Sequence, residues 1–345
     1  MIEKNEVLNW CFEVINRHAS NISDLGLMDG KTGIALAINK AQFLNPNKKT
    51  ITIGEGLVED ICENIKNNLS LNFYNGLGGV GWGFEHGFQQ GFFEGDSDEF
   101  LIDIDRKHIL SLVYKKPISL SLYEGILGYC FYFINRLQGI NSHEENFSTI
   151  TNMHCLKLSL EELKLILIQL DYDIVEPEEF SSLWDLPLLF ILLGECIEKK
   201  YFVNQVIEIT EKLIKKTREK PPIKTSSKLI LSLALKYYQL KSKITLKIEE
   251  DNSPIINFNE LQEDLEGKYS LNGYSGIALL SYKIFKMNNN EKFKYDALKY
   301  IQIAENIIKK IKNNAKTNTK EIINLGLSNG LSGFVFSKAI INKNE

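Results

Sequence analysis

The chain has 345 residues, 44% of them hydrophobic, and a formal net charge of −4 at pH 7, so it is long enough to bury a substantial core. An acidic chain whose basic stretch is expected to lack interleaved exposed aromatic residues is not typical of a nucleic-acid-binding protein, and we expect no nucleic-acid partner. No apolar run approaches the about 18 residues of a membrane span, and the N-terminus has no signal-peptide pattern. Five cysteines without CxxC spacing suit reduced thiols, so we expect a cytoplasmic protein without a membrane span.

A Gly-x-x-Gly pattern followed by an apolar helix recurs along the chain. The first example is LMDGKTGIALAIN (27–39), and similar stretches occupy 74–88, 122–137, 270–282 and 327–340. The long gap between the third and fourth examples holds two apolar stretches without the glycines, at 183–196 and 226–238. Because a fixed period is the mark of a repeat architecture, we predict seven inner helices. They are expected to start near residues 30, 76, 125, 186, 229, 273 and 330.

Helices that are apolar on one side only lie between these repeats. The stretches 56–69, 204–217 and 295–314 each place apolar residues on one helical face and polar residues on the other. A strand pattern occurs only at 244–250. Alternating outer and inner helices predict an all-α fold, an (α/α)7 toroid of seven outer–inner hairpins, in a single domain over 1–345. The repeats are expected near 24–44, 71–90, 119–138, 181–198, 225–241, 267–287 and 324–341.

A glycine at the start of a helix needs a physical reason, because it costs a helix interior about 1 kcal/mol relative to alanine. Glycine lets backbones approach closely, and inner helices that converge on one axis crowd at their starts. A helix start also has open N–H groups, which favour a polar or anionic ligand. We expect packing alone to explain the second glycine of each pair.

These repeats resemble the lanthionine synthetase C family, and the resemblance runs from about residue 24 to residue 340. It implies the α/α toroid and a role in the maturation of ribosomally made peptides. Members of the family add a peptide cysteine thiol to a dehydrated residue and so close a thioether ring. The resemblance also implies a zinc ion that activates the thiol, held by a Cys in the fifth repeat and a Cys-His pair in the sixth.

This chain departs from the zinc-binding pattern of the family. Leu271 and Asn272 stand where the Cys-His pair belongs, and Ser227 and Lys228 stand where the other Cys belongs. Leucine cannot ligate a metal, a neutral amide is a poor zinc ligand, and a lysine repels the ion. We therefore expect no zinc cofactor and no metal site.

The acid–base residues that the resemblance implies are also replaced. Trp184 and Asp185 stand where the family has a catalytic His, and Ser121 stands where it has an Asp. No catalytic residue can be assigned from the sequence, so whether the chain is an enzyme stays open.

Other metal or acid–base sites have weaker support. His154 and Cys155 are adjacent on a predicted helix and point about 100° apart, and His86 and Cys130 lie on neighbouring inner helices. We expect structural roles for all four. Asp29 and Glu124 precede repeat glycines and are candidates for a carboxylate pair, but nothing in the sequence sets their separation.

The residue before each first-glycine position is polar in all seven repeats, within otherwise apolar stretches. Asp and Asn are preferred helix N-caps, so capping alone is one interpretation, and capping together with ligand contact at one mouth of the toroid is the other. We call this set the mouth residues: Asp29, Asn75, Glu124, Asp185, Lys228, Asn272 and Asn329.

Three functions are compatible with the sequence. The first is a divergent, zinc-free member of the family that binds a precursor peptide or a partner dehydratase in lanthipeptide-type, bacteriocin-like maturation. Acidic residues gather in 54–105 and basic residues in 198–247, which provides two charged surfaces for such a partner, or simply two solvated helix faces. The second is an active thioether cyclase with a rearranged site. The third is a carbohydrate-active α/α toroid enzyme that uses paired carboxylates.

Overall fold

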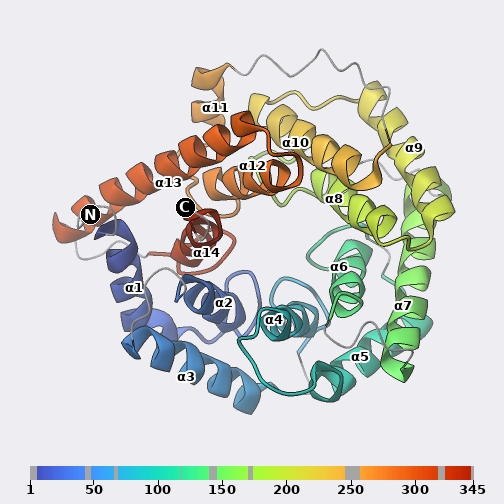
Figure 1. The fold of residues 1–345 in the computed structure, drawn as a ribbon, viewed down its shortest axis with the longest axis horizontal. Helices are drawn as coiled ribbons and strands as arrows, with labels where there is room; N and C mark the ends of the chain where they lie inside the picture. The colour runs from blue at the N-terminus through green and yellow to red at the C-terminus, as the bar shows by residue number, and fades with distance from the viewer. Residues whose placement is uncertain are drawn as a thin grey trace. The chain divides into compact units, whose positions relative to one another are not determined.

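The computed structural model describes residues 6–42, 48–65, 69–117, 119–139, 146–169, 174–244, 257–317 and 323–342. These residues form helices and connecting loops, and no strand occurs among them. The helices fall into two compact units (Figure 1). Unit 1 comprises Met1–Asn67, Glu179–Leu183 and Asn257–Glu345, and unit 2 comprises Asn68–Glu178 and Trp184–Ile256. The single-domain organisation expected for 1–345 stays a prediction.

Unit 1 has three inner helices, which are Gly-x-x-Gly-led: α2 (Lys31–Ala41), α12 (Tyr274–Asn288) and α14 (Leu331–Asn342). Helix α14 packs against both α2 and α12. Outer helices cover them, with α3 on α2, α13 on α12 and α1 on α14 (Figure 1). The other elements of the unit are α1 (Glu6–His18), the short 3-10 helix η2 (Ala19–Asn21), α3 (Lys48–Asn64), α11 (Phe258–Asp264) and α13 (Glu291–Thr317).

Unit 2 has four inner helices in a row, each packed against the next: α4 (Leu77–Gln89), α6 (Ile126–Arg136), α8 (Asp185–Glu198) and α10 (Thr225–Ser242). Three outer helices lie against the first three of them (Figure 1). These are α5 (Ser97–Tyr114), α7 (Phe147–Lys164), which continues into the π-helix η4 (Leu165–Gln169), and α9 (Val203–Glu219).

The predicted helices agree closely with the structure. Six of the seven inner helices begin within one residue of the expected position. The expected outer helices 204–217 and 295–314 lie in α9 and α13, and 56–69 overlaps α3, which ends at Asn64. Helix α10 is the exception, because it begins at Thr225 rather than near 229. The fifth repeat has no glycine to mark its start, so the sequence pattern could not locate it. The strand expected at 244–250 lies outside the described residues except for Ile244.

The core lies between the inner and outer layers. In α9 only Val206, Ile209, Thr210 and Leu213 are buried, which is the one-sided pattern of an outer helix. In α2 ten of the eleven residues are buried, because this inner helix is covered on nearly every side. None of the helices in the described part of the chain combines the length and apolar content that crossing a membrane requires.

Candidate functional site

The glycine-led helix starts are closed by their own preceding loops. Lys31 N–H donates to the carbonyl of Asp24 at 2.9 Å, and Leu77 N–H donates to that of Ser70 at 2.8 Å. The starts of α6 and α14 make the same bond to a carbonyl seven residues earlier, and α12 makes it to Lys268, six residues earlier. These bonds occupy N–H groups that were expected to be open for an anionic ligand, so that expectation is wrong.

The first glycine of each pair is needed for this loop to fold over the helix. A Cβ at Gly76 would lie less than 3.0 Å from the carbonyl oxygens of Ser70 and Asn72, and a Cβ at Gly30 would approach the backbone of Gly26 as closely. Real side chains do not tolerate such distances, so any larger residue must push the loop away. The glycine therefore serves a close approach within its own repeat.

The second glycine allows packing, as expected. A Cβ at Gly33 would approach the side chain of Leu327, and a Cβ at Gly276 would approach Ser182. In both cases the neighbour belongs to another repeat of unit 1. Each of these glycines is also close to a carbonyl of its own preceding loop.

The mouth residues do not cap the glycine-led helices whose caps are defined. In α2, α4, α6 and α12 the N-cap is the first glycine itself, and no side chain caps the helix. The residue before that glycine lies one position outside the helix, so it is not the N-cap residue. The capping interpretation is therefore wrong for Asp29, Asn75, Glu124 and Asn272.

Three mouth residues of unit 1 belong to hydrogen bonds between neighbouring repeats. Asp29 accepts a bond from the hydroxyl of Ser328 at 2.6 Å, and the backbone N–H of Asn272 donates to the Ser328 carbonyl at 2.8 Å. The Asn272 amide donates to Asn329 at 3.3 Å and accepts from the hydroxyl of Ser181. The structure thus brings Asp29, Asn272 and Asn329 into one chain of contacts.

In unit 2 only one mouth residue makes such a link. The carboxylate of Asp185 accepts the backbone N–H of Leu122 at 2.9 Å, and burial raises the pKa of this carboxyl while the hydrogen bond opposes the shift. The side chains of Asn75, Glu124 and Lys228 are exposed instead. These three are available for contact with a ligand.

The positions that the resemblance assigns to zinc are engaged in other ways. The carbonyl of Leu271 accepts a bond from Ser182, and the Asn272 amide binds Ser181 and Asn329. Ser227 is buried and Lys228 is exposed. No cluster of three or more His, Cys, Asp and Glu side chains that could hold a metal ion occurs in the described part of the chain. These residues do not fit a zinc ion.

Three of the four alternative ligands lie in structural surroundings, and His154 is exposed. His86 stacks on Trp82 with ring centroids 5.2 Å apart. Cys130 is fully buried, and burial raises the pKa of its thiol well above the usual value. Burial likewise raises the pKa of Cys155 to about 12. A thiol with a raised pKa is a poor source of the thiolate that binds metal or attacks a substrate.

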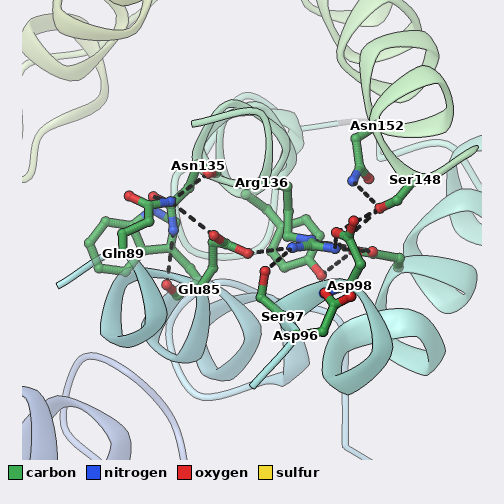
Figure 2. Close-up of polar contacts among 12 residues, drawn as sticks. Glu85, Gln89, Asp96, Ser97, Asp98, Asn135, Arg136, Ser148 and Asn152 are labelled. Carbon is green, nitrogen blue, oxygen red and sulfur yellow. Dashed lines mark hydrogen bonds and ion pairs between the residues drawn. The ribbon is translucent and has the colours of Figure 1, made fainter. Parts of the chain in front are cut away.

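A buried ion-pair network in unit 2 has no counterpart in the sequence predictions (Figure 2). Arg136, at the C-terminal end of α6, binds Glu85 of α4 and two carboxylates of α5, Asp98 and Asp105. Asp98 also accepts the hydroxyl of Ser148 from α7 at 2.9 Å, so the network joins four helices. The only sequence signal was an arginine at the end of the apolar stretch ILGYCFYFINR.

The surroundings of this network indicate a structural role. The side chains of Arg136 and Glu85 are 0% exposed, so no substrate reaches them. Burial alone would lower the pKa of Arg136, but Asp105, Tyr132 and Glu85 together outweigh it and raise the pKa. Asp105 also accepts the hydroxyl of Tyr132, on which His108 stacks at 4.4 Å. Burial lowers the pKa of His108, which favours a neutral ring.

The inner helices of unit 2 also share a partly exposed side, which we call the inner face. On α4, Phe84 and Phe88 contact Phe100 of the outer helix α5, whereas Trp82 and His86 lie on the opposite side and are partly exposed. The inner face continues along the neighbouring helices, with residues that are partly or fully exposed. They are Phe131 on α6, Leu188 and Ile191 on α8, and Lys228, Ser232 and Lys236 on α10.

The inner face is aromatic on α4 and α6. The ring of Phe73, just before α4, contacts Trp82 edge-on at 6.0 Å and Phe131 at 6.4 Å. The backbone N–H of Phe73 donates to the carbonyl of Tyr123 at 2.7 Å, and Tyr74 packs edge-on against Tyr123 at 4.7 Å. The aromatic row therefore runs from the start of α4 and α6 along their inner side.

Comparison with known proteins shows the fold. No family model and no curated protein matches the sequence. Among solved structures, nisin cyclase matches with a TM-score of 0.56 and 16% identity, over 97% of this chain and 93% of that chain. The predicted all-α toroid is confirmed at the level of fold class, and the resemblance to the lanthionine synthetase C family is supported by the same match. The chain thus shares its helical fold with nisin cyclase.

Proposed function

We propose that this chain is a divergent lanthionine synthetase C-like protein that binds a precursor peptide during lanthipeptide-type, bacteriocin-like maturation in the cytoplasm. The observation that carries the proposal is the fold shared with nisin cyclase over 97% of the chain. Conservation of the whole fold, rather than of one repeat, is expected when the shape of the binding surface matters. Fold alone does not determine chemistry, so the proposed role rests on the residues available at the site.

The proposed role is binding without zinc-dependent cyclisation. Leu271, Asn272, Ser227 and Lys228 provide no ligand set for zinc, and the cysteines Cys130 and Cys155 have raised pKa values. A thioether cyclase needs a thiolate near neutral pH and a group that protonates the product enolate. Neither group has been identified among these residues, so the active-cyclase alternative has no observation in its favour.

Two further possibilities have little support. Asp29 and Glu124, the candidate carboxylate pair of a carbohydrate-active enzyme, belong to different units, and Asp29 is bound by Ser328. A dehydratase partner on the charged stretches 54–105 and 198–247 stays a prediction.

The test is calorimetric titration of the protein with the dehydrated form of a Cys/Ser/Thr-rich precursor peptide encoded beside its gene. We expect saturable binding by the wild type. Glu124→Ala should weaken binding by about 1 kcal/mol, because the exposed carboxylate at the mouth loses a ligand hydrogen bond. The matched control is Glu99→Ala, which removes an exposed carboxylate from outer helix α5 and should leave affinity unchanged.

Two results would contradict the proposal. Absence of binding by the wild type to the dehydrated and unmodified peptides alike would exclude the peptide-binding role. Formation of thioether rings by the wild type alone, detected as thiols lost to alkylation without a change in peptide mass, would show an active cyclase.

A further inference from the structure

The basic edge of the inner face lies at a position that the family resemblance assigns to a metal ligand. Lys228 is in the first turn of α10, and Lys236 lies about two turns further along the same helix. Both side chains are exposed, and neither forms an ion pair with any described residue. Two cations on an inner helix, without a carboxylate partner, leave positive charge beside an apolar surface.

The apolar part of the inner face adjoins this charge directly. Helix α10 packs along α8, whose Leu188 and Ile191 are partly exposed on the inner face. Helix α6 follows with Phe131, and α4 with Trp82. Neighbouring helices are about 8–10 Å apart, so the four helices span a width that an extended segment of about nine residues would cover.

We propose that the inner face of unit 2 binds an extended apolar peptide segment that carries an acidic side chain, with the carboxylate on Lys228 and the apolar side chains on α8, α6 and α4. The proposal rests on the peptide-binding function above and names the ligand chemistry of that site. Charge complementarity carries it, because Lys228 is exposed beside the apolar residues of the inner face and no carboxylate of the described protein pairs with it. A lysine ammonium binds a carboxylate as a point charge.

This interaction differs from metal-dependent binding in what it recognises. A zinc ion would select a thiolate, whereas an ammonium selects a carboxylate and does not activate a thiol. The exposed position of Lys228 makes the contribution of the charge modest and sensitive to salt. The aromatic row is expected to supply affinity for apolar side chains regardless of charge.

The experiment uses two acetylated and amidated nine-residue peptides, Glu-Leu-Phe-Leu-Phe-Leu-Phe-Leu-Phe and its Gln counterpart, titrated into the full chain. Amidation removes the terminal carboxylate, so that only the side-chain carboxylate is tested. We expect the wild type to bind the Glu peptide about fivefold more tightly than the Gln peptide. In Lys228→Met this preference should disappear, because the Glu peptide loses the ammonium that binds its carboxylate. The Gln peptide should bind the variant and the wild type equally.

The matched control is Lys199→Met, an exposed lysine after the C-terminal end of α8, which should keep the fivefold preference. Circular dichroism of each variant checks that the fold is intact. Trp82→Leu should weaken both peptides by the same factor, since it removes apolar contact and no charge. A blue shift of fluorescence on peptide binding that is lost in this variant would assign the contact to Trp82.

The outcomes separate this inference from the proposed function. If the precursor binds the wild type but Lys228→Met keeps the preference for Glu, the inference is wrong and the proposed function stands. Equal binding of the Glu and Gln peptides by the wild type also overturns the inference. If the carboxyl-terminal acid form alone shows a preference that depends on Lys228, the ligand is a chain terminus and the internal-segment proposal is wrong.

Discussion

Arg136 is a buried cation in unit 2 that forms ion pairs with three carboxylates. Its guanidinium binds Asp105 at 2.8 Å and Asp98 at 2.8 Å, and it also pairs with the fully buried carboxylate of Glu85 (Figure 2). One positive charge thus serves three carboxylates, of which Glu85 and Asp105 are buried and Asp98 is partly exposed. A buried charge without a partner is costly, so the network is more sensitive to loss of its single cation than to loss of one carboxylate.

Replacement of this cation should therefore destabilise the fold strongly. We expect Arg136→Met to lower the free energy of unfolding by about 3–5 kcal/mol, because Glu85 and Asp105 stay buried without their partner. Urea unfolding followed by circular dichroism measures the change. The control is Arg106→Met, whose exposed guanidinium pairs with exposed Asp103, and which should change stability by less than about 0.5 kcal/mol. A similar small effect of both variants would contradict the structural role of the network.

At the scale of one element, the inner helices owe their glycines to the loops that fold over their starts. The loop before α2 is tightened by Asp24, whose carboxylate accepts the N–H of Gly26 at 2.6 Å, and its carbonyl then receives Lys31 N–H. Similar turns precede α4 and α14, where Asn72 and Asn324 accept backbone N–H groups. Each start is a small closed unit, in which the glycine leaves room for the returning chain.

This arrangement predicts opposite effects for two glycine-to-alanine changes within unit 1. Gly30→Ala should destabilise the protein by more than about 1 kcal/mol, because the new Cβ collides with the backbone of Gly26. Gly56→Ala, in the exposed part of α3, meets no atom within 4 Å and should stabilise by up to about 1 kcal/mol through helix propensity. Thermal unfolding of the two variants measures both effects. If Gly30→Ala were as stable as Gly56→Ala, the closed-start explanation would fail.

At the scale of the whole molecule, the chain shares the fold of nisin cyclase, and Leu271, Asn272, Ser227 and Lys228 stand at the positions that the family resemblance assigns to zinc ligands. We therefore predict that the purified protein contains less than about 0.1 zinc per chain after dialysis, since four-coordinate zinc needs Cys, His or carboxylate ligands. Elemental analysis measures the metal. A value near one zinc per chain would direct attention to His86, Cys130, His154 and Cys155 and would favour the active-cyclase alternative.

The sequence alone determined the helical repeats and most of their boundaries. Gly30 and Gly273 have short-range partners, within six residues along the chain, so the pattern they leave in the sequence repeats and can be detected. The mouth residues were found by the same periodicity. Their exposure was not predictable, because the partial burial of Asp185 and the exposure of Glu124 depend on neighbouring repeats.

Only the tertiary structure decided what those positions do. It showed that the helix starts are closed by loop carbonyls, which a residue pattern cannot distinguish from open N–H groups. It also brought Arg136 to Glu85, 51 residues away, and to Asp105, 31 residues away. Ion pairs across such separations leave no local signal, because each partner alone resembles an ordinary charged residue near a helix end. The inner face likewise exists only once four helices, each apolar by itself, pack side by side and leave one side of each uncovered.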